Sequence, residues 1–410
     1  MQRFEQQIRK EISKLLDEQK SQLEFYKNPD NAMEAFGSSL EKVATKLTHY
    51  KMIDLRSLLV SLQAKQLNLH SPDGSETNDG EIGDFYNVST RLLSRIIEIK
   101  REKHQQLTHP MVKKIVEFPV FSASNPHVGS DNRDKIQTEN GTLEVKRKGL
   151  RNAIYRNSQV NSGSQLTIFD QSVMLGIQKL WLNRVMTNKI QEPIKEISFH
   201  FSELMEAMER EVNSGLYDKI EESLLTLFSS DTTLVLTDDP YTNEPAETEL
   251  YHFFTKMRIS HARNSATVIF SDDMIQGLYS NDFISISMAQ LNDFQGSTAA
   301  LLYPLLHLWV QEGKKHFELD LDELIGHVNL LSSHRSKAVG IIQTAFNEMK
   351  EFDIIRDFST IKVGNKYALV RFEFHENYLE NYQKHRITIL KDADHTDWTF
   401  TNFESGGDLN

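Results

Sequence analysis

The sequence predicts an α+β fold that is mainly helical, and three observations support this prediction. Apolar residues recur at helical spacing through the first hundred positions. Two blocks after residue 142 share one order of helices and short strands. The segment between these regions, residues 119–141, is poor in apolar residues and has the composition of a linker. A chain of 410 residues is long enough for several domains of ordinary size.

Residues 1–118 are predicted to form a helical N-terminal domain. One helical pattern runs from residue 4 to residue 16, and a second runs from residue 36 to residue 62. A polar loop at 70–83 precedes a third helix, which extends to about residue 108. A bundle of this kind serves either oligomerisation or the docking of a partner, and its sequence leaves both roles open.

The block at residues 296–378 has the clearer pattern. A helix, a short strand at 317–319 and a short helix lead to an amphipathic helix that extends from 338 to 349. Two strands on either side of Gly364-Asn365 then form a hairpin. This order is typical of a winged helix-turn-helix domain, and residues 379–410 follow it as a C-terminal tail.

The long helix of this block has a polar side opposite its apolar stripe, without an acidic residue. Asparagine and glutamine can pair with adenine in the major groove, while lysine and serine reach phosphates. Glycine within a helix costs about 1 kcal/mol against alanine, so a close approach to DNA would explain it there. The predicted contacts on the helix are Ser333, Ser336, Lys337, Gly340, Gln343, Thr344 and Asn347, and those on the hairpin are Lys362 and Lys366. An ordinary solvated polar face is the alternative.

The block at residues 142–285 repeats this order of elements. The exposed side of its third helix is predicted to carry Asp218, Glu221 and Glu222, which phosphates would repel. We therefore expect this helix not to read DNA. Any contact from this block would come from its basic leading segment, which contains Lys146, Arg147, Lys148, Arg151 and Arg156.

The charge of the chain is distributed unevenly. The formal net charge is −12. Residues 141–190 nevertheless contain eight basic and two acidic residues, whereas residues 191–250 contain three basic and fifteen acidic residues. Nucleic-acid binding depends on the local field, so the acidic total does not exclude it.

Residues 149–374 resemble the iteron-binding plasmid replication initiators of the Rep/TrfA type. The resemblance rests on the opening stretch Leu150-Arg151-Asn152-Ala153-Ile154-Tyr155, on the strand and short helix at 199–208, and on the stretch Tyr217-Asp218-Lys219-Ile220-Glu221-Glu222-Ser223-Leu224. The tandem placement of the second block agrees with it. Each stretch is degenerate, and their order carries the resemblance.

The resemblance implies a bacterial cytoplasmic protein that binds direct repeats in double-stranded DNA at a plasmid origin and helps to melt the DNA beside them. It also implies recruitment of the replicative helicase and the sliding clamp, and an equilibrium between monomer and dimer. The stretch Gln165-Leu166-Thr167-Ile168-Phe169 is similar to clamp-docking peptides, with Gln165, Leu166 and Phe169 as the docking residues. The alternative is that its apolar residues belong to the core of the first block.

Enzymatic chemistry finds little support in the sequence, and we expect a protein that is not an enzyme and has no cofactor or metal. The chain has no cysteine, no His-x-His and no nucleotide-binding phosphate loop. The acidic pairs Asp238-Asp239 and Asp272-Asp273 lie beside predicted strand ends, where loop and capping roles are commoner. No apolar run is long enough to span a membrane, and the N-terminus lacks the apolar core of a secretory signal.

A different class of function also fits winged helices. They serve as protein-docking modules, so a subunit of a chromosome-organising complex is the main alternative, and a transcriptional repressor is another. The net charge of −12 and the helical N-terminus favour the protein-docking alternative. Retention of duplex DNA at low salt distinguishes the two classes.

Overall fold

The computed structural model describes most of the chain. The described residues are 2–25, 29–69, 79–117, 120–123, 133–138, 141–146, 153–155, 158–160, 166–188, 194–230, 232–236, 247–311, 315–328, 330, 335–364, 366–391 and 398–401. They form two compact units, Met1–Gln105 and Gln106–Asn410. No helix among these residues is long and apolar enough to cross a membrane.

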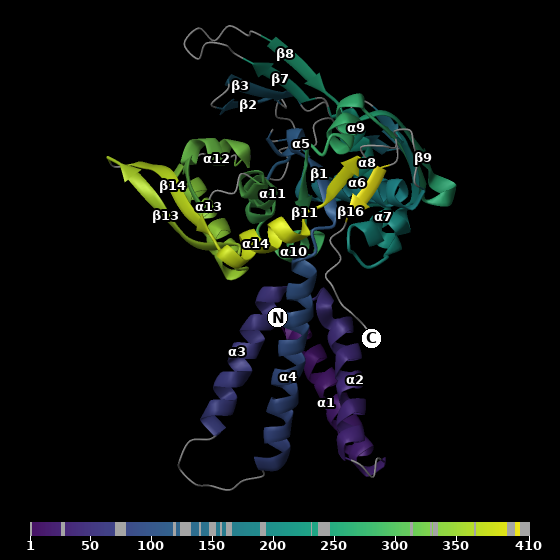
Figure 1. Cartoon of the computed structure of the whole chain (residues 1–410), viewed down its shortest axis with the longest axis vertical. Helices are drawn as coiled ribbons and strands as arrows, with labels where there is room; N and C mark the ends of the chain where they lie inside the picture. Colours follow the sequence, from purple (N-terminus) through teal and green to yellow (C-terminus); the bar gives the residue numbers. More distant parts are fainter. Residues whose placement is uncertain are drawn as a thin grey trace. The chain divides into compact units, whose positions relative to one another are not determined.

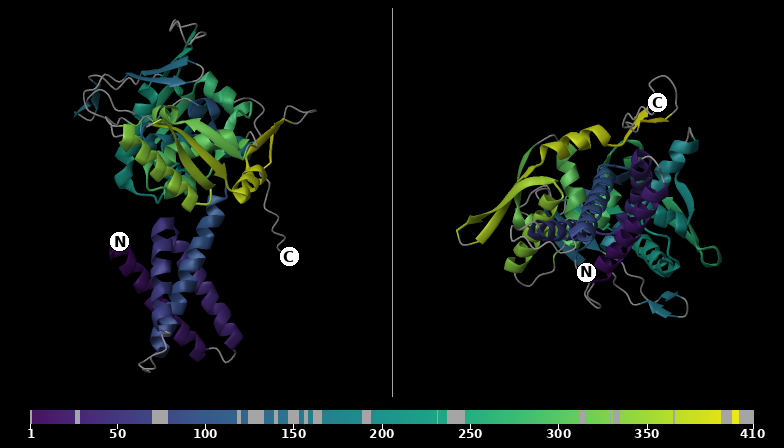
Figure 2. Two further views of the ribbon diagram at one scale, coloured as in Figure 1. Left: turned by 90° about the vertical axis from the view of Figure 1, so that its left-hand side faces the viewer. Right: turned by 90° about the horizontal axis from the view of Figure 1, so that it is seen from below.

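The first unit consists of helices that pack against each other along their lengths (Figure 2). They are α1 (Gln2–Phe25), α2 (Pro29–Lys46), the short η1 (Leu47–His49), α3 (Met52–Leu69) and α4 (Asp79–His104). The apolar residues that predicted helices, among them Ile8, Ile12 and Leu15, are almost completely buried. The predicted helical domain is therefore present, although its last helix begins inside the predicted loop.

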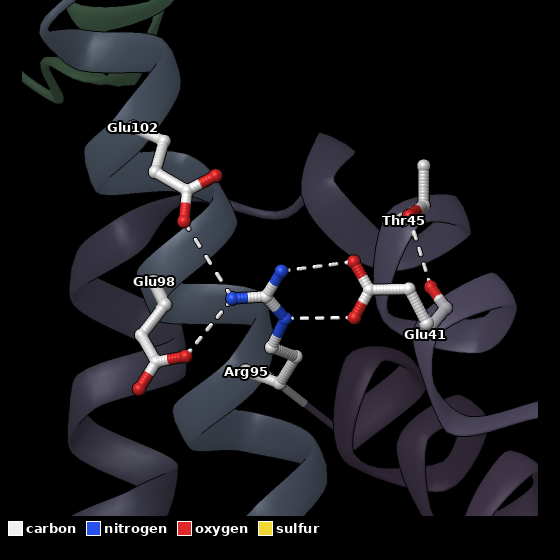
Figure 3. Close-up of polar contacts among 5 residues, drawn as sticks. All are labelled: Glu41, Thr45, Arg95, Glu98 and Glu102. Carbon is white, nitrogen blue, oxygen red and sulfur yellow. Dashed lines mark hydrogen bonds and ion pairs between the residues drawn. The ribbon is translucent and has the colours of Figure 1, made fainter. Parts of the chain in front are cut away.

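An arginine in α4 binds α2 and two carboxylates of its own helix (Figure 3). The guanidinium of Arg95 donates to both carboxylate oxygens of Glu41, at 2.7 Å and 3.0 Å. Its third nitrogen lies 3.1 Å from Glu98 and 3.6 Å from Glu102. These hydrogen bonds raise the pKa of Arg95 above its usual value. The cluster connects α2 to α4 with the two parallel bonds that only arginine can supply.

The second unit begins with a strand outside the two predicted blocks. β1 (His109–Val112) pairs antiparallel with β11 (Phe283–Ile286), and α5 (Lys113–Glu117) follows β1. The boundary of the N-terminal unit therefore lies at Gln105 and not at residue 118. The physical reason is that residues 109–117 bury their apolar side chains in the core of the second unit, where Met111 is fully enclosed.

The first block has the predicted order of elements. α6 (Ile168–Asn188), β6 (Glu196–His200), α7 (Phe201–Ala207) and α8 (Tyr217–Ser229) are followed by the hairpin of β9 (Phe254–Ser260) and β10 (Ser265–Phe270). The sheet order is β6-β10-β9. Two short helices, α9 (Asp272–Tyr279) and α10 (Met288–Asp293), lie between this hairpin and the second block. Asp272 and Asp273 occupy the first turn of α9 behind the capping residue Ser271, which agrees with a capping role.

The second block repeats the topology. α11 (Ser297–Gln311), β12 (His316–Asp320), α12 (Leu321–His327) and α13 (Arg335–Glu351) precede the hairpin of β13 (Ile355–Val363) and β14 (Lys366–Phe374). The sheet order is β12-β14-β13, which matches the order of the first block. Figure 1 shows this hairpin projecting beyond α12 and α13. The tandem winged-helix prediction is confirmed by these two sheets.

The predicted linker contains ordered structure. β2 (Arg133–Thr138) and β3 (Gly141–Lys146) form a four-stranded sheet with β7 (Thr232–Leu236) and β8 (Glu247–Tyr251), in the order β2-β3-β7-β8. Val120 and Phe121 are buried in the core of the unit. The linker interpretation of residues 119–141 was wrong at these positions, because short alternating strands carry too few apolar residues to stand out. A further pair, β4 (Ala153–Tyr155) and β5 (Ser158–Val160), follows.

The predicted tail begins inside a helix. α14 (Glu376–His385) crosses the predicted boundary at residue 378, and the strands β15 (Thr388–Lys391) and β16 (Trp398–Thr401) pair after it. Tyr382 of α14 is buried, and its hydroxyl accepts a hydrogen bond from the backbone amide of Ser285, at 3.3 Å. This contact makes α14 part of the folded body of the second unit.

Candidate nucleic-acid interface

The helix α13 is oriented by its apolar stripe. Ala338, Ile342, Ala345, Phe346 and Met349 are buried at the spacing of a helix with one face in the core. The side chains on the opposite side therefore face solvent. Among the predicted contacts, the structure exposes Ser336, Lys337, Gly340, Thr344 and Asn347. These five residues are the exposed face of α13.

Gly340 lies at the centre of the exposed face. A Cβ atom built on it would have no other atom within 4 Å, so the fold itself does not require glycine here. The hydroxyl of Thr344 donates to the carbonyl oxygen of Gly340, at 2.9 Å. An exposed helical glycine that the surrounding protein does not need is compatible with the close approach of a ligand.

Gln343 differs from its predicted role. Its side chain is half-buried, and its amide nitrogen donates to the hydroxyl of Thr360 on β13, at 2.9 Å. The bond connects α13 to the hairpin, and it uses one of the two N–H groups of the amide, which turns the side chain towards β13. Gln343 therefore serves first to join the helix to the strand, and Asn347 is the better candidate for reading a base.

Ion pairs hold both ends of α13. At the N-terminal end, Arg335 donates to both carboxylate oxygens of Asp322 on α12, at 2.7 Å and 2.9 Å. These bonds raise the pKa of Arg335 above its usual value. At the C-terminal end, Lys350 lies 2.8 Å from Asp357 on β13. The exposed face is held in place by the buried apolar stripe of α13, and the ion pairs add one contact with a neighbouring element at each end.

One carboxylate extends the exposed face at its end. Glu351, the last residue of α13, follows Asn347 by one helical turn and is exposed. The other nearby carboxylate, Glu348, is buried and accepts bonds from the backbone amides of Gln295 and Gly296. The face is therefore uncharged or cationic from Ser336 to Asn347 and becomes acidic only at its C-terminal limit.

The hairpin beside α13 contributes a second surface. Lys362 is exposed near its tip, and Val363 is 65% exposed. Gly364 has a φ of 64°, a left-handed conformation that glycine adopts without strain. The side chain of Lys366 lies outside the described residues, as does Ser333. The tip can approach a phosphate backbone while the exposed face of α13 lies in a groove.

In the first block, the helix that corresponds to α13 is acidic, as predicted, but one predicted residue is not on its surface. Asp218 and Glu222 of α8 are exposed, whereas Glu221 is buried. Its carboxylate lies 2.9 Å from the Nδ1 atom of His261, between β9 and β10. The prediction that Glu221 is exposed was wrong because the hairpin folds over that side of the helix.

The basic leading segment is not placed by the structure. Arg147, Lys148, Arg151 and Arg156 lie outside the described residues, and Lys146 ends β3 with a side chain that is not described. The prediction that the first block contacts DNA through this segment stays a prediction.

The hairpin of the first block carries cations that the sequence reasoning missed. Lys256, Arg258 and Arg263 are exposed. Lys256 and Arg258 point to the same face of the sheet because they are two residues apart in β9, where its pairing with β10 is regular. No acidic residue occurs from 252 to 271. This stretch without acidic residues follows the acidic segment at 191–250, and it is the signal in the sequence that could have indicated the cationic hairpin.

The stretch from Gln165 to Phe169 is folded into the first block. Leu166 is fully buried, and its carbonyl oxygen accepts a hydrogen bond from the amide of Ser122, at 2.8 Å. Phe169 is half-buried, with the guanidinium of Arg210 5.5 Å from its ring centre. Gln165 lies outside the described residues. The clamp-docking interpretation of Leu166 and Phe169 is therefore corrected: both pack in the body of this unit.

A protein-family model matches residues 154–307, and its description is "Initiator Replication protein, WH1". The match covers the first block from residue 154 onward and extends into α11. It confirms, for this segment, the predicted resemblance to plasmid replication initiators. No curated protein matches the sequence.

Solved structures that are similar to this chain include two of RctB and one of the Pi initiator protein. Domains 2 and 3 of RctB, as a selenomethionine derivative, are 9% identical over 59% of this chain and 90% of that chain, with a TM-score of 0.40. The Pi initiator protein in complex with iteron DNA is 16% identical over 50% of this chain and 92% of that chain, with a TM-score of 0.37. A second structure of RctB domains 2-3 is 9% identical over 60% and 92%, with a TM-score of 0.39.

Proposed function

We propose that this chain, whose residues 154–307 match the WH1 domain of initiator replication proteins, is a plasmid replication initiator that binds repeated origin DNA. The reading element is α13, with Asn347 and Gly340 toward the base edges and Lys337 and Lys362 toward phosphates. The observation that carries the proposal is the exposed face of α13, which lies opposite a buried apolar stripe and lacks carboxylates until Glu351.

The remaining features of the proposed role follow from the resemblance. The protein acts in the bacterial cytoplasm, recruits the replicative helicase and the sliding clamp, and interconverts between monomer and dimer. It needs no cofactor or metal and catalyses no reaction of its own. Since Leu166 and Phe169 are packed in the body of the unit, clamp recruitment would use another surface.

The test is the affinity of the full chain for duplexes that contain direct repeats from the DNA flanking its gene. Fluorescence anisotropy should give a preference of roughly 10³–10⁷-fold over random DNA, with affinity that falls steeply as salt rises. Asn347→Ala should lose about 1–3 kcal/mol on the repeats and little on random DNA. Asn377→Ala is the matched control, because Asn377 is an exposed asparagine on α14.

Two results would contradict the proposal. Equal losses on repeated and random DNA would remove the base-reading role from Asn347. Failure to retain any duplex at low salt, together with stoichiometric binding to a protein partner, would favour the protein-docking class of winged helix.

A further inference from the structure

A segment before the first block contacts both winged-helix blocks. It comprises residues 106–117 and 120–123 and is called the bridging segment below. On the side of the first block, the Nε2 atom of His109 donates to the carbonyl oxygen of Ala207 in α7, at 2.6 Å. The amide of Val112 donates to the side-chain oxygen of Gln178 in α6, at 3.2 Å.

The same segment binds the second block a few residues later. The Nε2 atom of His327, the last residue of α12, donates to the carbonyl oxygen of Val116, at 2.8 Å. The amide of Ala123 donates to the carbonyl oxygen of Val328, at 3.1 Å. The hydroxyl of Ser297, the first residue of α11, donates to the carbonyl oxygen of Ala123, at 3.0 Å.

Apolar packing strengthens these polar contacts. Ile115 and Phe121 are almost completely buried, and the ring of Phe121 stacks on Phe253 at the start of the hairpin in the first block. A Cβ atom on Gly277 in α9 would lie 2.7 Å from Val112, so glycine at this position permits the close approach of the bridging segment. The segment is thus inserted between the blocks and does not lie loosely on either one.

We propose that the bridging segment is a positioning element that holds the two winged-helix blocks at one separation and so determines which spacing of DNA contacts the protein accepts. The part that concerns DNA rests on the proposed function. The part that concerns the separation of the blocks rests only on the contacts described above. His327 is a positioning residue, because it bonds the bridging segment directly to the helix that precedes α13.

The test is the distance between the blocks in the full chain. The chain has no cysteine, so Lys219→Cys in α8 and Glu351→Cys in α13 provide two unique sites for spin labels. Pulsed electron paramagnetic resonance should give one narrow distribution of distances between the two labels. Ser297→Ala/His327→Ala should broaden it or add a second distance, whereas His316→Ala/Ser359→Ala, which changes two exposed residues of the same block, should leave it unchanged.

A second variant keeps the test independent of the polar contacts. Ile115→Ala/Phe121→Ala removes apolar packing from the bridging segment and should broaden the distribution further, with circular dichroism used to confirm that the chain is folded. A narrow, unchanged distribution in folded samples of both double variants would overturn the proposal.

A DNA experiment extends the test. The unmodified chain should bind its repeat at least tenfold more tightly than a repeat lengthened by two base pairs at its centre. In Ser297→Ala/His327→Ala the ratio of the affinities for the original and the lengthened repeat should fall towards one. An unchanged preference would overturn the link between the bridging segment and spacing. If no variant binds DNA, the proposed function fails, while the distance measurement still decides the role of the bridging segment.

Discussion

The fold does not require glycine at position 340, because an added methyl group would meet no atom within 4 Å. Gly340→Ala should therefore stabilise the second unit by about 1 kcal/mol, the difference in helix propensity. The same substitution should weaken binding to repeated DNA by about tenfold, because displacement of the helix weakens base contacts worth about 1–3 kcal/mol each. Chemical denaturation and anisotropy measure the two effects.

Thr344→Ala is the control for the predicted loss of DNA binding. Thr344 lies one turn away on the same face and already has a Cβ atom, so its change should not crowd a ligand. If Gly340→Ala strengthened DNA binding in parallel with stability, the close-approach role of the glycine would be excluded.

Two buried histidines are neutral in the fold. Burial lowers the pKa of His109 to about 4 and that of His307 to about 3. The unfolded chain therefore binds more protons between these values and about 6.5, so stability is complete above pH 6.5 and is lost as pH falls towards 4. We expect each histidine to lower the free energy of unfolding by on the order of 2 kcal/mol at pH 5 relative to pH 8.

Denaturation at several pH values tests this expectation. His109→Gln keeps a donor for the carbonyl oxygen of Ala207 and cannot be protonated, so its stability should depend less on pH than that of the unmodified chain. His316→Gln changes an exposed histidine and should preserve the original slope. If stability depended on pH equally in both variants, the conclusion that His109 is neutral in the fold would be contradicted.

At the scale of elements, the two blocks use the same topology with different surfaces. The long helix of the second block exposes neutral and cationic residues, whereas α8 exposes Asp218 and Glu222. The hairpin of the first block carries Lys256, Arg258 and Arg263 without an acidic residue beside them. We therefore expect the first block to contact phosphates through β9 and β10 and not to insert α8 into a groove.

Replacing Lys256, Arg258 and Arg263 with alanine tests this arrangement. Each lost phosphate contact should reduce the slope of log affinity against log salt by about 1, with similar losses on repeated and random DNA. The control replaces Lys10, Lys42 and Lys46, three exposed cations of the N-terminal helices. A salt slope that falls equally in both triple variants would reflect net charge and not contact.

At the scale of the whole molecule, the chain has two compact units with separate cores. The Arg95 cluster belongs only to the first. Arg95→Lys should destabilise that unit by about 1 kcal/mol, because lysine cannot form the two parallel bonds to Glu41 and the pair is partly exposed. Calorimetry should show the shift in one transition only, and the control Lys10→Arg should shift neither.

The chain's tandem organisation was predictable because winged-helix elements leave strong local patterns. The apolar stripe of α13 and the turn at Gly364 are such patterns, and both were placed correctly. The role of Gln343 was not predictable, since its partner Thr360 comes from a strand that local periodicity cannot align with the helix. Glu221 was misplaced for the same reason, because His261 covers it from the hairpin.

The sequence alone determined which segments form helices and hairpins and which side of α13 faces solvent, because those properties depend on the spacing of apolar residues within a few turns. The tertiary structure decided how distant segments combine. It showed that residues 109–117 and 120–123 join both blocks and that Leu166 is enclosed in the core. These contacts depend on backbone atoms and on shape, which residue order does not encode locally.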